Sequence, residues 1–178
     1  GPLAFFGQAE AMGPGSELPK FVRFKIGDLE VTQLYDGVWQ KSHDPGFIKN
    51  ATVEETKKAL REAGITDAHV PITFTVTVVR MGDRTIMFDA GTGGQMAPTA
   101  GLMMKEGVQA AGIDPKAINT IVMTHFHPDH IFGLMEKGTN AQVFPDAEIA
   151  VPSSEYKYWT DPGLISTLPE ARQGLAKR

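Results

Sequence analysis

The residues best suited to chemistry stand together in one short segment, His125–His130. It holds three of the five histidines of the chain together with Asp129. Neutral imidazole and carboxylate are ligands that borderline metals such as zinc prefer. The preceding residues, 119–124, are largely β-branched or apolar and carry no charge, so they predict a short buried strand. The cluster therefore leaves the end of a strand, where ligands gather in α/β proteins.

The spacing within this segment favours two metal positions. In an extended chain His125 and His127 point to the same side and can hold one metal. Pro128 ends the strand and bends the chain, so Asp129 and His130 emerge on a different heading, suited to a second metal. Two metals about 3.5–4 Å apart can activate a bridging water. The alternative is a histidine-rich surface loop or tag, but a tag would not follow a buried strand.

Three segments resemble one known family. The pattern His125-x-His127-x-Asp129-His130 after an apolar strand resembles the signature of the metallo-β-lactamase-fold hydrolases. The segment Thr85–Gly93 is similar to the strand of that superfamily that ends in Asp-x-Gly. The segment Phe24–Gly37 resembles most closely the branch that contains methyl parathion hydrolase and related lactonases. These landmarks extend over nearly the whole chain.

The resemblance implies an α/β fold, a four-layer αβ/βα sandwich whose C-terminal half is absent from this sequence. It implies two divalent transition-metal ions, zinc first, with manganese, iron or cobalt as alternatives. A metal-bridged hydroxide would then cleave a small ester-like bond in a lactone, an aryl ester or a phosphotriester. His125, His127, Asp129 and His130 would be metal ligands, and Asp129 would also carry a proton to the leaving group.

Two further residues gain an interpretation from the resemblance. Asp89 would lie behind the ligands and orient the metal loop, as ligating histidines require. Its alternative is a turn-forming Asp before Gly91. Phe132 stands where the superfamily often has a small residue, so it would narrow or line the substrate pocket, or else pack in the core. The isolated His43 and His69 are expected to make hydrogen bonds rather than bind metal.

Other functions stay open from the sequence. One is a thioester hydrolase of the glyoxalase II kind or an iron-dependent oxidative member, which a metal assay would distinguish. Another is a non-catalytic metal-binding fragment that needs a complementing chain. Counting the protein ligands that converge on each metal would separate this fragment from an enzyme.

The extent of the chain bears on this question. Its 178 residues, 42% of them hydrophobic, suffice for a domain with a core. No histidine follows His130, whereas the resemblance implies further ligands in a second half. We therefore expect residues 21–178 to form the N-terminal half of the fold, with an apolar face exposed where the other half would pack. A homo-oligomer or association with the missing C-terminal half would cover that face.

Composition excludes several partners. The net charge is −4 without a basic stripe, which argues against nucleic acid. No apolar run approaches the ~20 residues that span a bilayer, and the chain has no cysteine. Residues 1–20 are expected to be a flexible terminus. Leu3–Phe6 with Ala9–Ala11 resembles the tail of a signal peptide, which favours export, whereas Gly1-Pro2 resembles a protease scar from a removed tag.

The periodicity predicts one domain of alternating strands and helices. A hairpin is expected around Gly27-Asp28, a capping box at Thr52 should open a helix, and either Ser153 or Ser154 should cap another. Residues 38–51 are expected to form a loop. The predicted strands are 21–26, 29–35, 72–80, 85–89, 120–124 and 147–151, and the predicted helices are 52–63, 98–111, 131–136, one containing 156–159 and one beginning at Pro169.

Overall fold

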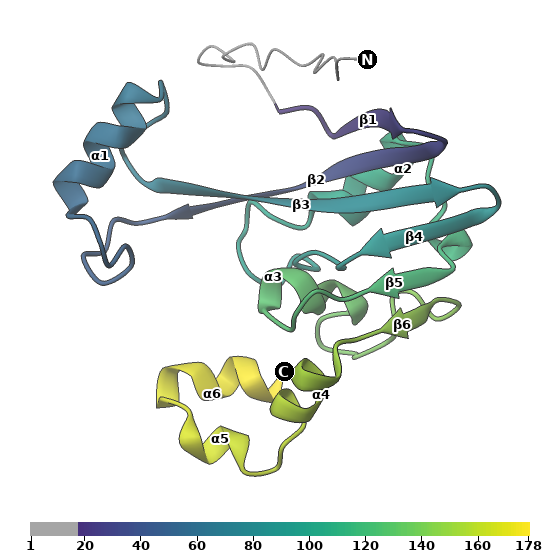
Figure 1. Ribbon diagram of the computed structural model, residues 1–178. Helices are drawn as coiled ribbons and strands as arrows, with labels where there is room; N and C mark the ends of the chain where they lie inside the picture. Colours follow the sequence, from purple (N-terminus) through teal and green to yellow (C-terminus); the bar gives the residue numbers. More distant parts are fainter. Residues whose placement is uncertain (1–17) are drawn as a thin grey trace. The chain divides into compact units, whose positions relative to one another are not determined.

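The computed structural model describes residues 18–178, so the expectations for residues 1–17 lie outside the described part of the chain. A six-stranded mixed sheet with the order β1-β2-β3-β4-β5-β6 is its main element (Figure 1). This arrangement confirms the predicted α/β class. The strands are β1 (Phe21–Ile26), β2 (Leu29–Lys41), β3 (Val70–Met81), β4 (Arg84–Phe88), β5 (Thr120–Val122) and β6 (Glu148–Ala150).

Strand direction changes across the sheet. β1 pairs antiparallel with β2, and β3 pairs antiparallel with β4, with Thr77 opposite Phe88. β4, β5 and β6 run parallel, which aligns Phe88 with Val122 and Val122 with Ala150. Because parallel strands end at the same edge, the residues that follow β4 and β5 meet there. Topology therefore brings Asp89 beside Thr124.

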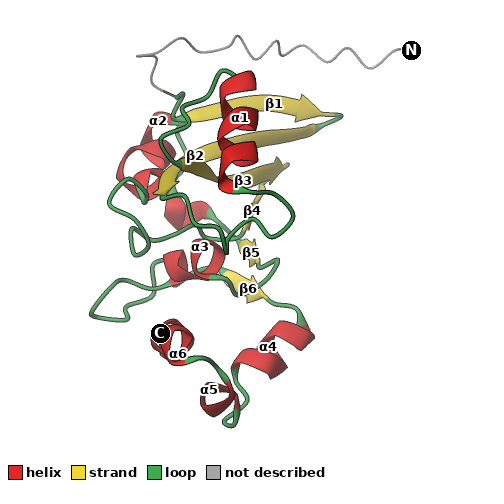
Figure 2. Ribbon diagram, turned by 90° about the vertical axis from the view of Figure 1, so that its left-hand side faces the viewer, coloured by secondary structure: helices red, strands yellow, loops and turns green. Residues whose placement is uncertain are grey.

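The helical segments are short (Figure 2). None in residues 18–178 has the length and apolar character needed to cross a membrane. The helices are α1 (Val53–Glu62), α2 (Val108–Ala110), α3 (Pro128–Ile131), α4 (Ser153–Trp159), α5 (Leu164–Thr167) and α6 (Glu170–Lys177). The π-helical turn η1 (Met103–Gly107) runs into α2, and the 3₁₀ turns are η2 (Pro115–Ala117) and η3 (Phe132–Leu134).

The chain divides into two compact units, one of which contains residues 40–70 and the other residues 20–39 and 71–178. In the first unit, α1 begins at the predicted capping box. Thr52 Oγ1 accepts from the Glu55 amide at 3.2 Å, and the Glu55 carboxylate accepts from the Thr52 amide at 2.7 Å. Also in this unit, His43 Nε2 lies 2.7 Å from the Asp67 carbonyl oxygen, which is the hydrogen-bonding role expected for it.

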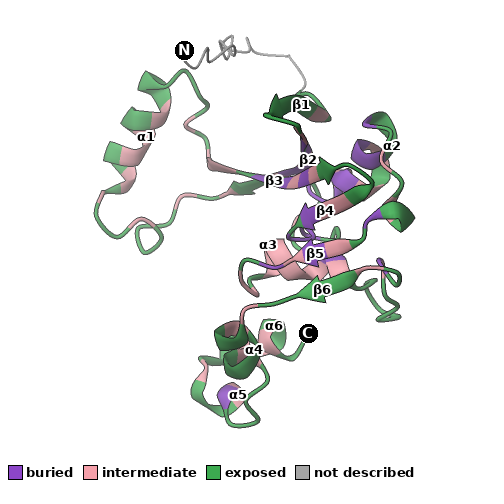
Figure 3. Ribbon diagram, turned by 45° about the vertical axis from the view of Figure 1, so that its right-hand side comes forward, coloured by how far each residue is buried: buried purple, intermediate pink, exposed green. Residues whose placement is uncertain are grey.

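The core of the second unit lies on one face of the sheet (Figure 3). Val78, Met87 and Ile121 point to that face and pack with Met103 and Val108 of the η1–α2 segment. The alternate residues of the same strands point to the other face, since side chains alternate along a strand. Its members Val79, Ile86 and Val122 are half-buried, and Phe88 is 38% exposed. This face therefore carries apolar side chains that are less buried than those of the core face.

Two predicted boundaries were wrong around the η1 segment. The strand predicted to end at residue 35 continues to Lys41, so residues 38–41 belong to β2 and not to the predicted loop. In this added part the Val38 amide donates to the Thr99 carbonyl oxygen at 3.2 Å. The helix predicted for 98–111 begins at Met103 with a π-helical turn. Gly101 explains the late start. Its φ of +96° is left-handed, and a Cβ at this position would lie 2.6 Å from the Cα of Gly94, so this position before the helix must be glycine.

The later helices also differ from the prediction. α3 begins at Pro128, not at Ile131, so this proline both ends the extended segment and occupies the first helical turn. The N-cap of α4 is Pro152, not Ser153 or Ser154. Pro169 is the N-cap of α6 instead of its first residue, and α5 was not predicted.

Gly133 joins the two loops that the site depends on, and this generates a prediction. A Cβ at Gly133 would lie 1.8 Å from the Ala90 carbonyl oxygen. The Gly133 amide donates to the Gly91 carbonyl oxygen at 3.1 Å. Gly133→Ala should lower the free energy of unfolding in urea by about 1–3 kcal/mol or more, the usual cost of overpacking.

The matched control is Gly174→Ala in α6, where a Cβ meets no atom within 4 Å. This variant should be neutral or more stable by up to about 1 kcal/mol, because alanine favours helix. Equal unfolding curves for the two variants would contradict the close approach of Gly133 to Ala90.

Candidate functional site

The four predicted ligands come from two neighbouring segments. His125 and His127 lie in the loop after β5, and Asp129 and His130 lie in α3. The ring centroid of His125 is 4.6 Å from that of His127 and 4.0 Å from that of His130. His127 is exposed, and the other three side chains are half-buried. The structure therefore gathers the three rings at the carboxyl edge of the parallel strands.

Asp89 is the shared hydrogen-bond acceptor behind these rings. Its Oδ1 accepts from the Thr124 amide at 2.7 Å. Its Oδ2 accepts from the Thr124 hydroxyl at 2.8 Å and from His130 Nδ1 at 2.7 Å. Asp89 has a left-handed φ of +61°, a conformation that non-glycine residues adopt at an energetic cost and that often marks a functional site. The carboxylate thus ties the end of β4 to both segments of the cluster.

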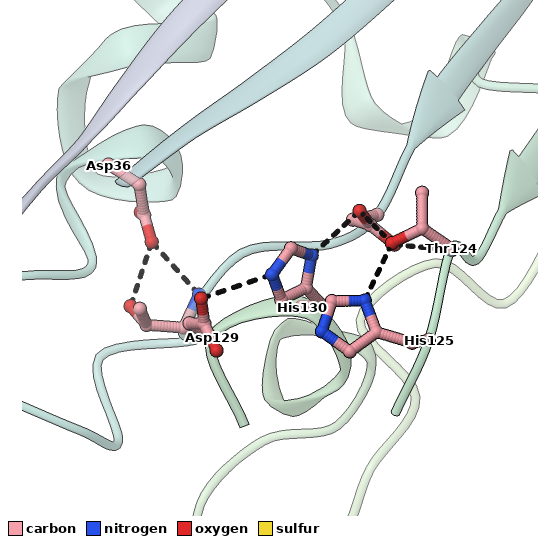
Figure 4. Close-up of polar contacts among 7 residues, drawn as sticks. Asp36, Thr124, His125, Asp129 and His130 are labelled. Carbon is pink, nitrogen blue, oxygen red and sulfur yellow. Dashed lines mark hydrogen bonds and ion pairs between the residues drawn. The ribbon is translucent and has the colours of Figure 1, made fainter. Parts of the chain in front are cut away.

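The hydrogen bonds indicate which nitrogen carries the hydrogen in the rings of His125 and His130. The single hydroxyl hydrogen of Thr124 goes to Asp89, so the hydroxyl oxygen accepts from His125 Nδ1, which lies 2.9 Å away (Figure 4). His130 donates its Nδ1 hydrogen to Asp89 directly. The Nε2 lone pairs of His125 and His130 therefore stay available, which is the arrangement of metal-ligating imidazoles.

The position of Asp129 makes the His130 ring unusual. His130 Nε2 lies 3.1 Å from Asp129 Oδ2, on the opposite side of the ring from Asp89 (Figure 4). A neutral imidazole has one N–H and cannot donate to both carboxylates. With the hydrogen on Nδ1, an Nε2 lone pair faces a carboxylate oxygen. A cation at Nε2, either a proton or a metal, is needed to make this contact favourable.

Burial and the nearby histidines favour the neutral form of the His125 ring. Burial lowers the pKa of His125 below the usual value for histidine, and repulsion from His130 and His127 lowers it further. A lowered pKa means that the His125 ring stays neutral at a pH where an ordinary histidine gains its second ring hydrogen. Its lone pair is therefore available around neutral pH.

Asp36 supports the site from within the core and was missed in the sequence. It is 1% exposed. Its Oδ2 accepts from the amide and the hydroxyl of Thr92 at 2.9 and 2.8 Å, and its Oδ1 accepts from the Met103 amide at 3.0 Å. Asp36 thereby fixes the turn after Asp89. An acid two residues after Leu34, at a core-facing position of the strand, was the available signal.

Glu155 was also missed. It lies in α4, and its Oε2 accepts from the Phe126 amide at 2.9 Å and from Trp159 Nε1 at 3.0 Å. The hydrogen bond from Phe126 is the main cause that lowers the pKa of Glu155. The spacing to Trp159 is readable in the sequence, but nothing there indicates the contact with Phe126.

Phe132 lies in η3 next to the ligands and is half-buried. The Arg178 guanidinium carbon is 5.8 Å from the centroid of the Phe132 ring, and the Phe132 carbonyl oxygen accepts from Gln95 Nε2 at 3.0 Å.

Within residues 18–178, no three His, Asp or Glu side chains converge closely enough to form a complete metal site. The donor types are nevertheless those of a zinc or iron site, and the Asp129–His130 pair presents two of them to one point.

Comparison with known families gives a match over the region that holds the candidate site. The family model of the metallo-beta-lactamase superfamily matches residues 75–168, more than half of the chain. The matched range contains Asp89 and the four candidate ligands. None of the curated proteins with which the chain was compared matches it.

Solved structures share the fold. The hydrolase AbOPH of the beta lactamase superfamily has a TM-score of 0.78 and 25% identity over 91% of this chain and 54% of its own. The dizinc quorum-quenching lactonase AidC has a TM-score of 0.74 and 27% identity over 88% of this chain and 57% of its own. A probable metal-dependent hydrolase from Staphylococcus aureus has a TM-score of 0.61 and 20% identity over 81% of this chain and 54% of its own. This chain thus spans just over half the length of each.

The link through Thr124 can be tested in isolation. Thr124→Val removes the hydroxyl that connects His125 to Asp89 and leaves the bond between His130 and Asp89 intact. In ¹⁵N NMR of the histidine rings, His125 should lose its fixed Nδ1–H form while His130 keeps it. The free energy of unfolding should fall by about 1–3 kcal/mol, because the hydroxyl takes part in two hydrogen bonds of about 0.5–1.5 kcal/mol each. Thr124→Ser retains the hydroxyl and serves as the control. Unchanged His125 ring signals in the valine variant would refute the link.

Proposed function

The chain belongs to the metallo-beta-lactamase superfamily, and from this we propose that it carries the metal-binding end of a dinuclear metal-dependent hydrolase. The observation that carries the proposal is the His130 ring between two carboxylates. Asp89 receives the hydrogen of Nδ1, and Asp129 lies 3.1 Å from Nε2. Two donors on one zinc at about 2.0–2.2 Å are roughly 3.3–3.6 Å apart in tetrahedral geometry. The 3.1 Å between Asp129 Oδ2 and His130 Nε2 is slightly shorter, so a small separation of the two atoms would admit the ion.

We assign His125 and His127 to one metal and Asp129 and His130 to the other. Three imidazoles and a carboxylate suit zinc, manganese, iron or cobalt, and zinc is our first choice because AidC is described as a dizinc enzyme. Divalent ions at these positions would supply a Lewis acid and a water of lowered pKa. The assignment is supported by the donor types and by the separation of the two segments, one before and one after Pro128.

The residues of this chain have separable tasks in such a reaction. Asp89 and Thr124 hold the rings of His130 and His125 with their Nε2 atoms free. Asp129 presents an ionisable carboxylate at the ligand cluster and can accept a proton and pass it to the leaving group. Phe132, on the turn that follows α3, is proposed as a wall of the substrate pocket.

The proposed substrate is a small molecule with an ester-like bond: a lactone, an aryl ester or a phosphotriester. The similarity to AidC, a lactonase solved with the product N-hexnoyl-L-homoserine, supports the lactone first. The sequence resemblance of Phe24–Gly37 to the branch of methyl parathion hydrolase supports the phosphotriester. In each of these substrates an electrophilic carbon or phosphorus is bonded to the leaving oxygen, and this oxygen takes up a proton when the bond breaks.

We further propose that residues outside this sequence complete the ligand set, either in the same protein or in a second chain. Catalytic zinc normally has three protein ligands, and four candidates cannot supply two metals at that number. The assays below therefore use the complete gene product that contains this sequence. A homo-oligomer is one form in which a second chain would contribute.

Metal removal should abolish the activity. After dialysis against a chelator, hydrolysis of a lactone, an aryl ester and a phosphotriester should fall to background, and added zinc, manganese or cobalt should restore it. Elemental analysis before dialysis should find about two transition-metal ions per active site. Full activity in the metal-free protein, or no metal uptake, would contradict the proposal.

Asp129→Asn should keep the fold and lose most of the turnover. The amide has the shape of the carboxylate but cannot take up a proton, and general acid–base roles are typically worth about 10²–10⁴-fold. Steady-state rates at saturating substrate measure the loss. The exposed Asp146 provides the control Asp146→Asn, which should leave kcat unchanged. An Asp129→Asn variant with normal kcat and metal content would make Asp129 a turn residue.

A further inference from the structure

We propose that Glu155 is a positioning residue that fixes the backbone between His125 and His127 and thereby determines where both rings lie. The proposal rests on the metal site described above. It starts from one contact, the hydrogen bond from the Phe126 amide to Glu155 Oε2 at 2.9 Å. Phe126 is the residue between the two histidines, so a restraint on its amide acts on both neighbours.

The loop itself offers the Phe126 amide no regular backbone partner. β5 ends at Val122 and α3 begins at Pro128, so Phe126 belongs to neither the ladder nor the helix. A half-buried amide without an acceptor costs free energy, so the carboxylate from α4 satisfies a real requirement. The ring of Phe126 packs against the hydrophobic core. Phe126 is therefore held at two points, its ring in the core and its amide on Glu155.

The two histidines differ in how much they need this restraint. The His125 ring has its own hydrogen bond to Thr124, and the His130 ring has one to Asp89. Within the described residues, the His127 ring makes no hydrogen bond, and its side chain is exposed. The position of His127 thus depends on the backbone. Asp89 holds the loop backbone at Thr124, and Glu155 holds it at Phe126, the residue next to His127.

Trp159 holds Glu155 in place. Its Nε1 donates to the same Oε2 at 3.0 Å, one turn further along α4. The paired donors restrict the Glu155 side chain to one geometry. Each of these hydrogen bonds gains from the negative charge, because hydrogen bonds to an ionised carboxylate are about twice as strong as neutral ones. A glutamine would keep the shape and one acceptor oxygen but lose the charge.

The first measurement needs no metal. In the metal-free complete gene product, hydrogen exchange of the Phe126 amide reports the contact directly. Glu155→Ala should speed this exchange roughly tenfold or more, the effect of one charge-assisted hydrogen bond. Glu155→Gln should lie between wild type and alanine, and Glu148→Ala, at an exposed residue of β6, should change nothing. Equal exchange in wild type and Glu155→Ala would overturn the proposal.

The second measurement separates positioning from simple attachment of α4. Zinc affinity, measured by competition with a chromogenic chelator, should fall about 10–100-fold in Glu155→Ala, the range for residues behind metal ligands, and recover in part in Glu155→Gln. Faster exchange with unchanged zinc affinity would overturn the positioning role and leave Glu155 as an anchor of α4. A wild-type protein without zinc affinity would overturn the proposed function and this role together. If Glu155→Ala does not fold, the comparison of Glu155→Gln with wild type decides by the same two readings.

Discussion

The Asp89 carboxylate is the point on which the rest of the site depends. It receives the Thr124 amide and hydroxyl and the His130 Nδ1 hydrogen, so one side chain ties β4 to the loop after β5 and to α3. Parallel pairing of β4 with β5 makes these contacts possible, because both strands end at one edge. Asp36 fixes the turn after Asp89 from the core side. The site is therefore held by buried carboxylates that accept backbone and hydroxyl hydrogens.

Local signals in the sequence predicted much of this arrangement. The capping box of α1, the hairpin of β1 and β2 and the strand before the histidines follow from residue types and spacing, and each is present. The grouping of His125, His127, Asp129 and His130 was predicted in the same way. The nitrogen that carries the hydrogen in the His125 and His130 rings was not predicted. It depends on hydrogen bonds to Thr124 and Asp89, and the bond to Asp89 joins residues far apart in the sequence.

Features that rest on distant contacts stayed hidden. The contact of Glu155 with Phe126 joins residues from two separate elements, and no periodicity reports it. The late start of the η1 segment follows from the close approach of Gly101 to Gly94, a packing constraint. Asp36 could have been found as an acid at an inward-facing strand position, a pattern that requires a buried partner.

The central proposal is that a metal ion binds at His130 and Asp129 within this histidine cluster. X-ray absorption at the zinc edge of the zinc-loaded complete gene product tests it most directly. We expect imidazole scattering with zinc–nitrogen distances of about 2.0–2.1 Å and oxygen ligands at about 2.0–2.2 Å. A spectrum of zinc surrounded by oxygen alone, without the imidazole signal, would contradict the claim.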